Sequence, residues 1–437
     1  MNWFSRLFRR KSARFPSYER DGSSLGAASP PAGRRGPSAP DSSLPGFSAS
    51  ASLLDHRGTR ATMADRQHSY RRAFLPSQPV HDATAFAGRT ELLRRVIRAI
   101  EDQHLHVVLY GDRGIGKTSV LRVVHELAGK ANYVVQYASC GEDTDFCELF
   151  RSIAARVPLL YDAQFDPTIE AVERGGSLAD RLPAGPFTVS QLSDVMANIA
   201  GTRVLLILDE FDRAASVRFR NSVAELIKNL SDRSIRVQLL IAGVAANLND
   251  LIAHVPSIRR NIVGIGVPNM TNDEVRELVA IGERVGHVRM ADDAVARLVA
   301  GSAGLPYIAA LIGQHATLVS IEDGAAEISA AHVDTAFARA QDDILSRLSP
   351  SAAYILARPG HLAPESVFVT AANEAVMHGG QIANPAITAA LAELVEPESA
   401  MFTKIVDNLE GAWRFSEDGV SSYIWLAAGR NGAKNGA

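Results

Sequence analysis

The sequence predicts an α/β fold in which a parallel sheet is flanked by helices, because continuous apolar runs alternate with segments of helical periodicity. The runs at 204–208 and 237–241 are typical of strands that are buried on both faces of a sheet. A third run at 106–110 leads into a glycine-rich loop, and apolar residues at helical spacing follow that loop. Further strands are expected at 133–137 and 262–267.

The glycine-rich loop matches the pattern G-x-x-x-x-G-K-[ST]. Backbone N–H groups of such a loop surround phosphates, its lysine supplies a point charge, and its hydroxyl binds Mg²⁺. The loop lies where a strand leads into a helix N-terminus, which favours anions. The residues expected to bind a nucleotide are Gly111, Asp112, Arg113, Gly114, Ile115, Gly116, Lys117, Thr118 and Ser119. The fold class is therefore a P-loop NTPase core, and ATP and Mg²⁺ are the expected cofactors.

Two acidic residues, Asp209 and Glu210, follow the apolar run at 204–208. They stand at the carboxyl end of a buried strand, where ligands meet parallel sheets. One acid there can hold Mg²⁺ through its water shell, and a second can orient or deprotonate the attacking water. We therefore assign Thr118 and Asp209 to the metal, and Lys117 and Glu210 to catalysis. The alternative is a strand end that simply meets solvent.

Phe86-Ala87-Gly88-Arg89 stands before an amphipathic helix at 92–100, the first strand and the phosphate loop. This arrangement resembles the start of AAA+ ATPases of the Orc1/Cdc6-like and STAND-related group. The whole resemblance covers about residues 74–345. The separation of about 90 residues between the loop and Asp209 is also similar in that group. The resemblance implies that Phe86, Gly88 and Arg89 lie on the adenine side of the pocket.

The same resemblance gives expectations for two later positions. AAA+ proteins usually carry a polar sensor where this chain has Ala242-Gly243, which puts efficient hydrolysis in question unless Asn247 serves instead. An arginine finger neutralises charge on the transferred phosphoryl group, and it is expected at Arg260, with Arg259 as the alternative. A solvated basic turn is the other interpretation of these two arginines.

A helical lid is expected after the last core strand. Thr271 and Glu274 predict a capping box at its first helix. Pro306 resembles the proline of STAND ATPases that packs on the adenine and links the lid to the bound nucleotide. Taken alone, Pro306 is a proline in a first helical turn, which is a common structural use.

The C-terminal segment is expected to hold helices followed by a hairpin. Alternating runs at 413–415 and 423–425 flank a Glu-Asp-Gly turn, and this order resembles a winged-helix domain. Residues 350–437 have 5 Lys/Arg against 9 Asp/Glu, whereas surfaces that bind DNA are basic. An unidentified protein partner is therefore favoured over DNA.

The N-terminal segment is basic, with 13 Lys/Arg against 5 Asp/Glu in residues 1–80. Most of it lacks apolar periodicity and is expected to be disordered. Residues 1–11 combine aromatic and basic side chains in a pattern that suits an amphipathic contact with anionic lipid. The alternatives are a frayed basic tail or a true start at Met63. No run of 18 apolar residues is present, so a cytoplasmic protein is expected, with peripheral contact to the inner face of the membrane as an option.

Four regions are expected: the basic segment 1–73, an AAA+ core at 74–267, a helical lid at 268–345 and a winged-helix-like domain at 346–437. The predicted function is an ATPase that couples Mg·ATP binding and hydrolysis to conformational change and to a partner. The family resemblance also implies a homo-oligomer. Two alternatives stay open: a DNA-associated loader or transposition-type helper, and a non-hydrolysing nucleotide-gated scaffold at the membrane surface.

Overall fold

The computed structural model describes most of the chain from residue 74 onward. The described residues are 74–76, 85–165, 175–245, 248–251, 258–358, 360–378, 380–404, 411–417 and 419–434. The basic segment 1–73, including the amphipathic contact predicted at 1–11, and Asn247 lie outside them. All described residues belong to one compact unit.

Five parallel strands form the central sheet in the order β2-β3-β4-β1-β5. Their bounds are β1 His106–Gly111, β2 Val134–Ser139, β3 Val204–Asp209, β4 Val237–Val244 and β5 Ile262–Gly266. The predicted fold class is confirmed. Because β4 lies between β1 and β3, the loop after β1 and the acids after β3 flank the carboxyl end of β4.

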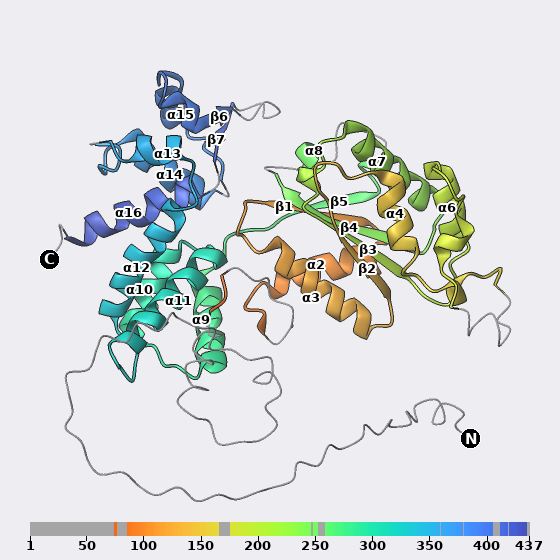
Figure 1. The fold of residues 1–437 in the computed structure, drawn as a ribbon, viewed down its shortest axis with the longest axis horizontal. Coiled ribbons are helices and arrows are strands. Elements are labelled where there is room, and N and C mark those ends of the chain that lie inside the picture. The colour runs from red at the N-terminus through yellow and green to blue at the C-terminus, as the bar shows by residue number, and fades with distance from the viewer. Residues whose placement is uncertain are drawn as a thin grey trace, which may run out of the picture. The chain divides into compact units, whose positions relative to one another are not determined.

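Helices cover both faces of this sheet (Figure 1). On one face lie α2 Thr90–Glu101 and α3 Lys117–Lys130, and on the other lie α4 Phe146–Ala154, α6 Val189–Ala197 and α7 Val217–Asp232. A short helix, α8 Leu248–Leu251, follows β4. Alternate residues of β3 enter the two apolar clusters: Leu205 packs with α2 and α3, and Leu206 packs on the opposite side.

A buried histidine links β1 to β4 at the end of the sheet where both strands begin. His106 is 2% exposed, and its Nδ1 accepts a hydrogen bond from Leu239 N at 2.9 Å. Its Nε2 lies 3.1 Å from Ser231 Oγ. Burial lowers the pKa of His106 from 6.5 to about 4, so the ring is neutral at physiological pH.

We expect His106 to make stability depend on pH between about 6.5 and 4. In that window the unfolded chain binds a proton that the folded chain excludes, so stability falls as the pH falls. The shift corresponds to a loss of about 3 kcal/mol at its full extent. Urea unfolding at several pH values measures the slope of the free energy of unfolding against pH. His106→Gln should flatten it, His104→Gln should keep the wild-type slope, and equal slopes in both variants would contradict the assignment.

Four helices follow the sheet in the segment that is expected to be a lid. They are α9 Asn272–Gly286, α10 Asp292–Ser302, α11 Pro306–Glu322 and α12 Ala330–Leu345. The predicted capping box is present, because Thr271 Oγ1 accepts from Glu274 N at 3.2 Å and Glu274 Oε2 accepts from Thr271 N at 2.8 Å. Pro306 is the first residue of α11, as predicted.

The C-terminal segment contains the helices α13 Pro350–Leu356, α14 Val367–Met377, α15 Pro385–Ala392 and α16 Val420–Lys434, with a hairpin of β6 Phe402–Lys404 and β7 Trp413–Phe415. The predicted hairpin between 413–415 and 423–425 is wrong. Its second run lies within α16, where Val420, Tyr423, Ile424 and Ala427 are buried at helical spacing. The strand at 413–415 instead pairs with 402–404. The comparison with a winged helix stays a prediction.

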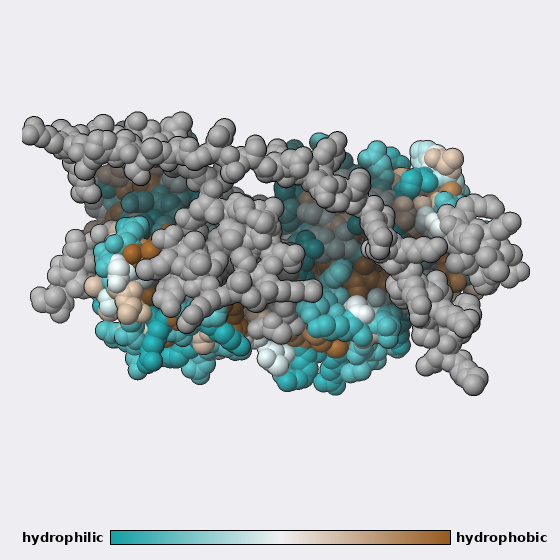
Figure 2. Space-filling view, turned by 60° about the horizontal axis from the view of Figure 1, so that its bottom comes forward, coloured by the Kyte–Doolittle hydropathy of each residue, from teal (hydrophilic) through white to brown (hydrophobic). Residues whose placement is uncertain are grey.

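The surface of the described residues is mainly hydrophilic on the face that Figure 2 displays, with smaller hydrophobic areas between. Large apolar side chains that are more than half exposed are few among them: Leu160, Val217, Tyr354, Met377 and Val395. None of the described helices is both long enough and apolar enough to cross a membrane.

Candidate nucleotide-binding site

The phosphate loop joins β1 to α3, and its glycines adopt backbone angles that other residues rarely take. Gly114 has φ 76° and Gly116 has φ 93°. Gly116 is also the N-cap of α3, so the helix N-terminus opens directly onto the loop. Ile115 is 1% exposed and packs in the apolar cluster with α2 and α3, which holds the loop on the sheet. The geometry is that of an anion-binding loop.

Lys117 begins α3 and is buried. Its Nζ donates to the carbonyl oxygens of Gly111 and Asp112, each at 2.8 Å. The ammonium group is therefore held inside the curve of the loop, where a bound phosphate would meet it. Arg113 and Gly114 are exposed, and Ser119 is half-buried in the first turn of α3.

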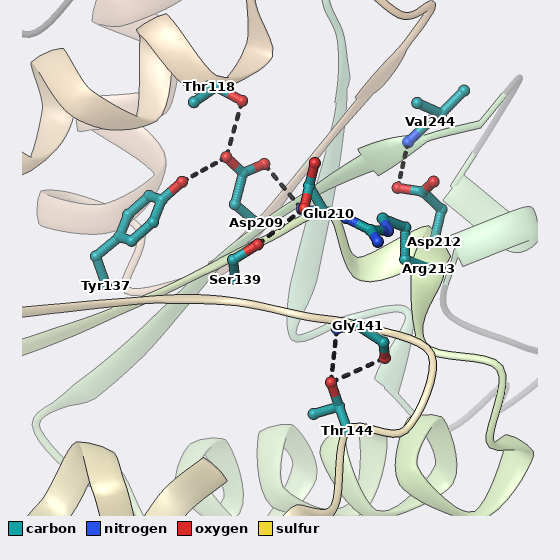
Figure 3. A network of polar contacts seen from close by, with 10 residues as sticks. All are labelled: Thr118, Tyr137, Ser139, Gly141, Thr144, Asp209, Glu210, Asp212, Arg213 and Val244. Atoms are coloured by element: carbon teal, nitrogen blue, oxygen red, sulfur yellow. Dashed lines mark hydrogen bonds and ion pairs between the residues drawn. The ribbon is translucent and has the colours of Figure 1, made fainter. Parts of the chain in front are cut away.

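Thr118 and Asp209 are joined directly, as Figure 3 shows. Thr118 Oγ1 donates to Asp209 Oδ2 at 2.8 Å, and Tyr137 OH donates to the same oxygen at 2.6 Å. Asp209 Oδ1 accepts from Glu210 N at 2.9 Å. Burial, and then the hydrogen bond to Asp209, raise the pKa of Tyr137 above its ordinary value, so its hydroxyl remains a donor. The carboxylate of Asp209, 3% exposed, is thus oriented by three donors.

Glu210 follows Asp209 in the left-handed conformation, with φ 52°. Its Oε2 accepts from Ser139 Oγ and from Arg213 Nη1, both at 2.9 Å. A non-glycine residue in this conformation costs energy, and such costs cluster at functional sites. The turn carries the exposed Glu210 side chain away from the buried path of β3 to the same edge as Thr118.

Gly243, one of the two residues at the position of the expected sensor, leaves no room for a side chain. A Cβ atom on Gly243 would lie 2.5 Å from Leu251 Cδ2 and 2.9 Å from Asp212 Oδ1. Asp212 occupies this space because its Oδ1 accepts from Val244 N at 2.8 Å. The carboxylate of Asp212, in the turn after β3, therefore stands at the end of β4 in place of a β4 side chain.

Family comparison agrees with this geometry. Residues 85–241 match the family described as AAA ATPase domain. These residues are an AAA ATPase domain. The match includes the phosphate loop, Asp209 and Glu210, and it ends within β4.

Solved structures similar to this chain include ORC2 of Aeropyrum pernix in ADPNP–ADP complexes, with 15% identity, 84% of this chain and 99% of that chain covered, and a TM-score of 0.45. Cdc6p of Pyrobaculum aerophilum has 13% identity, coverages of 83% and 98%, and a TM-score of 0.44. RuvB of Thermotoga maritima, a Holliday junction branch migration motor, has 14% identity, coverages of 77% and 95%, and a TM-score of 0.40. Among curated proteins, none matches this sequence.

The segment at the start of the AAA ATPase domain contacts α9, the first helix after the sheet. Gly88 N donates to Glu277 Oε2 at 2.9 Å, and Arg89 N donates to Glu274 Oε1 at 2.5 Å. The Arg89 Nη1 atom lies 2.9 Å from where a Cβ on Gly116 would be. Its guanidinium is therefore placed beside the phosphate loop. Burial lowers the pKa of Arg89 to about 10, which leaves it charged at neutral pH.

Pro306, which was predicted, and its neighbour Tyr307, which was not, lie against the loop of the AAA ATPase domain. Pro306 Cγ lies 3.9 Å from the position of a Cβ on Gly116, and Tyr307 Cβ lies 3.1 Å from that on Gly114. The first turn of α11 thus covers the glycines of the loop. Phe86 packs with the apolar cluster of α2 and α3.

Arg260 is not brought to the site within its own chain. Its side chain is 77% exposed and lies 3.6 Å from Asp232. The turn that holds Arg259 and Arg260 precedes Ile262, which pairs with His106 at the start of β1. The phosphate loop follows the end of β1, so a full strand length separates the two arginines from the phosphates.

Residues of β2 contribute to the site although the sequence patterns did not single them out. Tyr137 and Ser139 point to the acids because β2 pairs with β3 in the register Ser139↔Asp209. Asp212 was also missed, although a third acid two positions after Glu210 was visible in the sequence. Among the described residues no group of three His, Cys, Asp or Glu side chains could hold a metal by itself.

Proposed function

We propose that this chain binds Mg·ATP at the phosphate loop and hydrolyses it. The observation that carries the proposal is the contact between Thr118 and Asp209 at the N-terminus of α3, with Glu210 next to them. Mg²⁺ in nucleotide sites needs only one or two protein oxygens besides the phosphates. The Thr118 hydroxyl and the Asp209 carboxylate are oxygen donors 2.8 Å apart, so these residues fit that ion.

Each residue then has a distinct task. Lys117 and the backbone N–H groups of the loop bind the phosphates, and Thr118 and Asp209 hold the metal, which neutralises phosphate charge when bound. Glu210 accepts a proton from the attacking water or orients that water. Arg260 completes the site of a neighbouring copy in a homo-oligomer, which is consistent with its exposure and its distance from the phosphates of its own chain.

In this proposal, binding of the nucleotide changes the position of the lid helices. Pro306 and Tyr307 lie on the loop glycines, and Arg89 lies between the loop and α9. A nucleotide that reorders the loop would therefore act on α9 and α11 at the same time. In this proposal the core at 74–267 binds the nucleotide, the lid at 268–345 moves in response, and the region at 346–437 binds the partner.

A protein partner is favoured over DNA for the C-terminal region. A surface that binds DNA is basic, whereas residues 350–437 carry 5 Lys/Arg against 9 Asp/Glu. This excess of acidic residues supports a nucleotide-regulated protein that acts on another protein.

Replacing Lys117 by Ala should weaken ATP binding by about tenfold to a hundredfold, because a charge-assisted contact to phosphate is lost. Equilibrium binding of fluorescent ATP to the full chain measures the change. Lys130→Ala is the matched control, since it removes the other lysine of α3 at the far end of that helix. Equal affinities in the two variants would overturn the assignment of the site.

A further inference from the structure

The hydroxyl of Tyr137 makes a short contact with the proposed metal site. Tyr137 lies on β2, one strand beyond Asp209, and its OH donates to Asp209 Oδ2 at 2.6 Å. That oxygen also accepts from Thr118, the other proposed ligand (Figure 3). One carboxylate oxygen is therefore shared between the phosphate-loop helix and β2.

Arg122 fixes the ring of Tyr137 from the other side. It stands one turn after Thr118 in α3, and its guanidinium carbon lies 3.7 Å from the centroid of the Tyr137 ring. The Nε atom of Arg122 is buried with no hydrogen-bond partner among the described residues. A buried donor without a partner is unfavourable, so the stacking on Tyr137 is the contact that accounts for the place of this side chain.

We propose that Tyr137 is a positioning residue for Mg²⁺, holding the Asp209 carboxylate in the orientation that the metal requires, with Arg122 holding Tyr137. This inference rests on the proposed Mg·ATP site. A carboxylate can rotate about its last bond, and hydrogen bonds from outside the ligand set fix that rotation. The Thr118 oxygen can bind the metal through a lone pair while its proton still donates to Asp209, so the donor on β2 adds a second hydrogen bond that fixes Oδ2 from outside the ligand set.

The test compares nucleotide binding by the full chain with and without the metal. Tyr137→Phe removes one oxygen and keeps the ring under Arg122. Loss of such an outer contact should raise the Mg²⁺ concentration for half-maximal tightening of ADPNP binding by about tenfold, while affinity in EDTA stays within about twofold of wild type. Tyr133→Phe is the matched control, because its hydroxyl faces Glu101 at 3.5 Å, away from Asp209.

A double variant separates positioning from a general structural effect. In an Asp209→Ala background, Tyr137→Phe should change the metal dependence no further, because the hydroxyl then has no carboxylate to orient. Thermal unfolding of each variant checks that the chain is folded, and the EDTA affinity reports the phosphate loop independently of the metal.

The possible failures can be told apart. If the wild-type chain binds ADPNP equally well in Mg²⁺ and in EDTA, the proposed metal site fails and this inference fails with it. If the wild type depends on Mg²⁺ but Tyr137→Phe behaves like Tyr133→Phe, only the role of Tyr137 is overturned. A Tyr137→Phe chain that weakens binding equally in EDTA would likewise overturn it, in favour of a structural role.

Discussion

Replacing Glu210 by Gln should reduce phosphate release from ATP by about a thousandfold while ATP binding stays near the wild-type value. The amide keeps the shape of the side chain and can still accept a hydrogen bond from Ser139 Oγ, but it cannot take a proton from water. The ion pair with Arg213 is also lost, and because both partners are about half exposed this loss should be small. Phosphate release under saturating Mg·ATP measures the rate, and fluorescent ATP measures the binding.

The matched control is Glu225→Gln, which changes an exposed acid on α7. It should release phosphate at the wild-type rate. A Glu210→Gln variant that also does so would remove Glu210 from the mechanism. If the wild type itself releases no more phosphate than Lys117→Ala, hydrolysis is excluded and the non-hydrolysing scaffold becomes the better description.

The crowded end of β4 bears on the rate of this reaction. Ala242-Gly243 has no side chain that could donate a hydrogen bond to the γ-phosphate, and the space beside Gly243 is taken by Asp212 and Leu251. An acid at this place repels a phosphate, whereas a neutral polar sensor would attract it. The glycine is therefore explained by packing, and Asp212 is a reason to expect slow turnover in the isolated chain.

The sequence was sufficient for the parts of the fold that depend on long apolar runs. β3 and β4 are buried on both faces, so their runs of Val, Leu and Ile are continuous and easily recognised. The phosphate loop was recognisable because its glycines and Lys117 are needed in a fixed order. Thr118 and Asp209 were assigned to one metal from chemistry alone, and the structure brings them to 2.8 Å.

Other parts needed information that single segments do not hold. Tyr137 and Ser139 reach the acids only because β2 pairs with β3, and the strand order is not written in any local pattern. The run at 423–425 has the aromatic and β-branched residues that are common in strands, but over a longer window the buried apolar residues follow the helical period. Only that longer window distinguishes α16 from a second strand.

Replacing Gly304 by Ala should destabilise the junction between the sheet and the lid by about 4 kcal/mol. Gly304 has φ 74°, and an added Cβ would lie 2.3 Å from the carbonyl oxygen of Met270. Met270 N also donates to Gly304 O at 2.8 Å, so the two backbones cannot separate without losing that bond. The strain acts two residues before Pro306, and ATP binding should weaken with it because the first turn of α11 covers the phosphate loop.

Gly324→Ala is the matched control, since Gly324 has φ 64° but nothing within 4 Å of an added Cβ. It should cost only the backbone strain, about 1–2 kcal/mol, with ATP affinity unchanged. Urea unfolding of both variants, with and without ATP, measures the difference. Equal losses of stability in the two variants would show that the contact with Met270 adds no cost beyond the backbone strain. Lower stability of Gly304→Ala with wild-type ATP affinity would separate the lid from nucleotide binding, and the coupling through Pro306 would then be wrong.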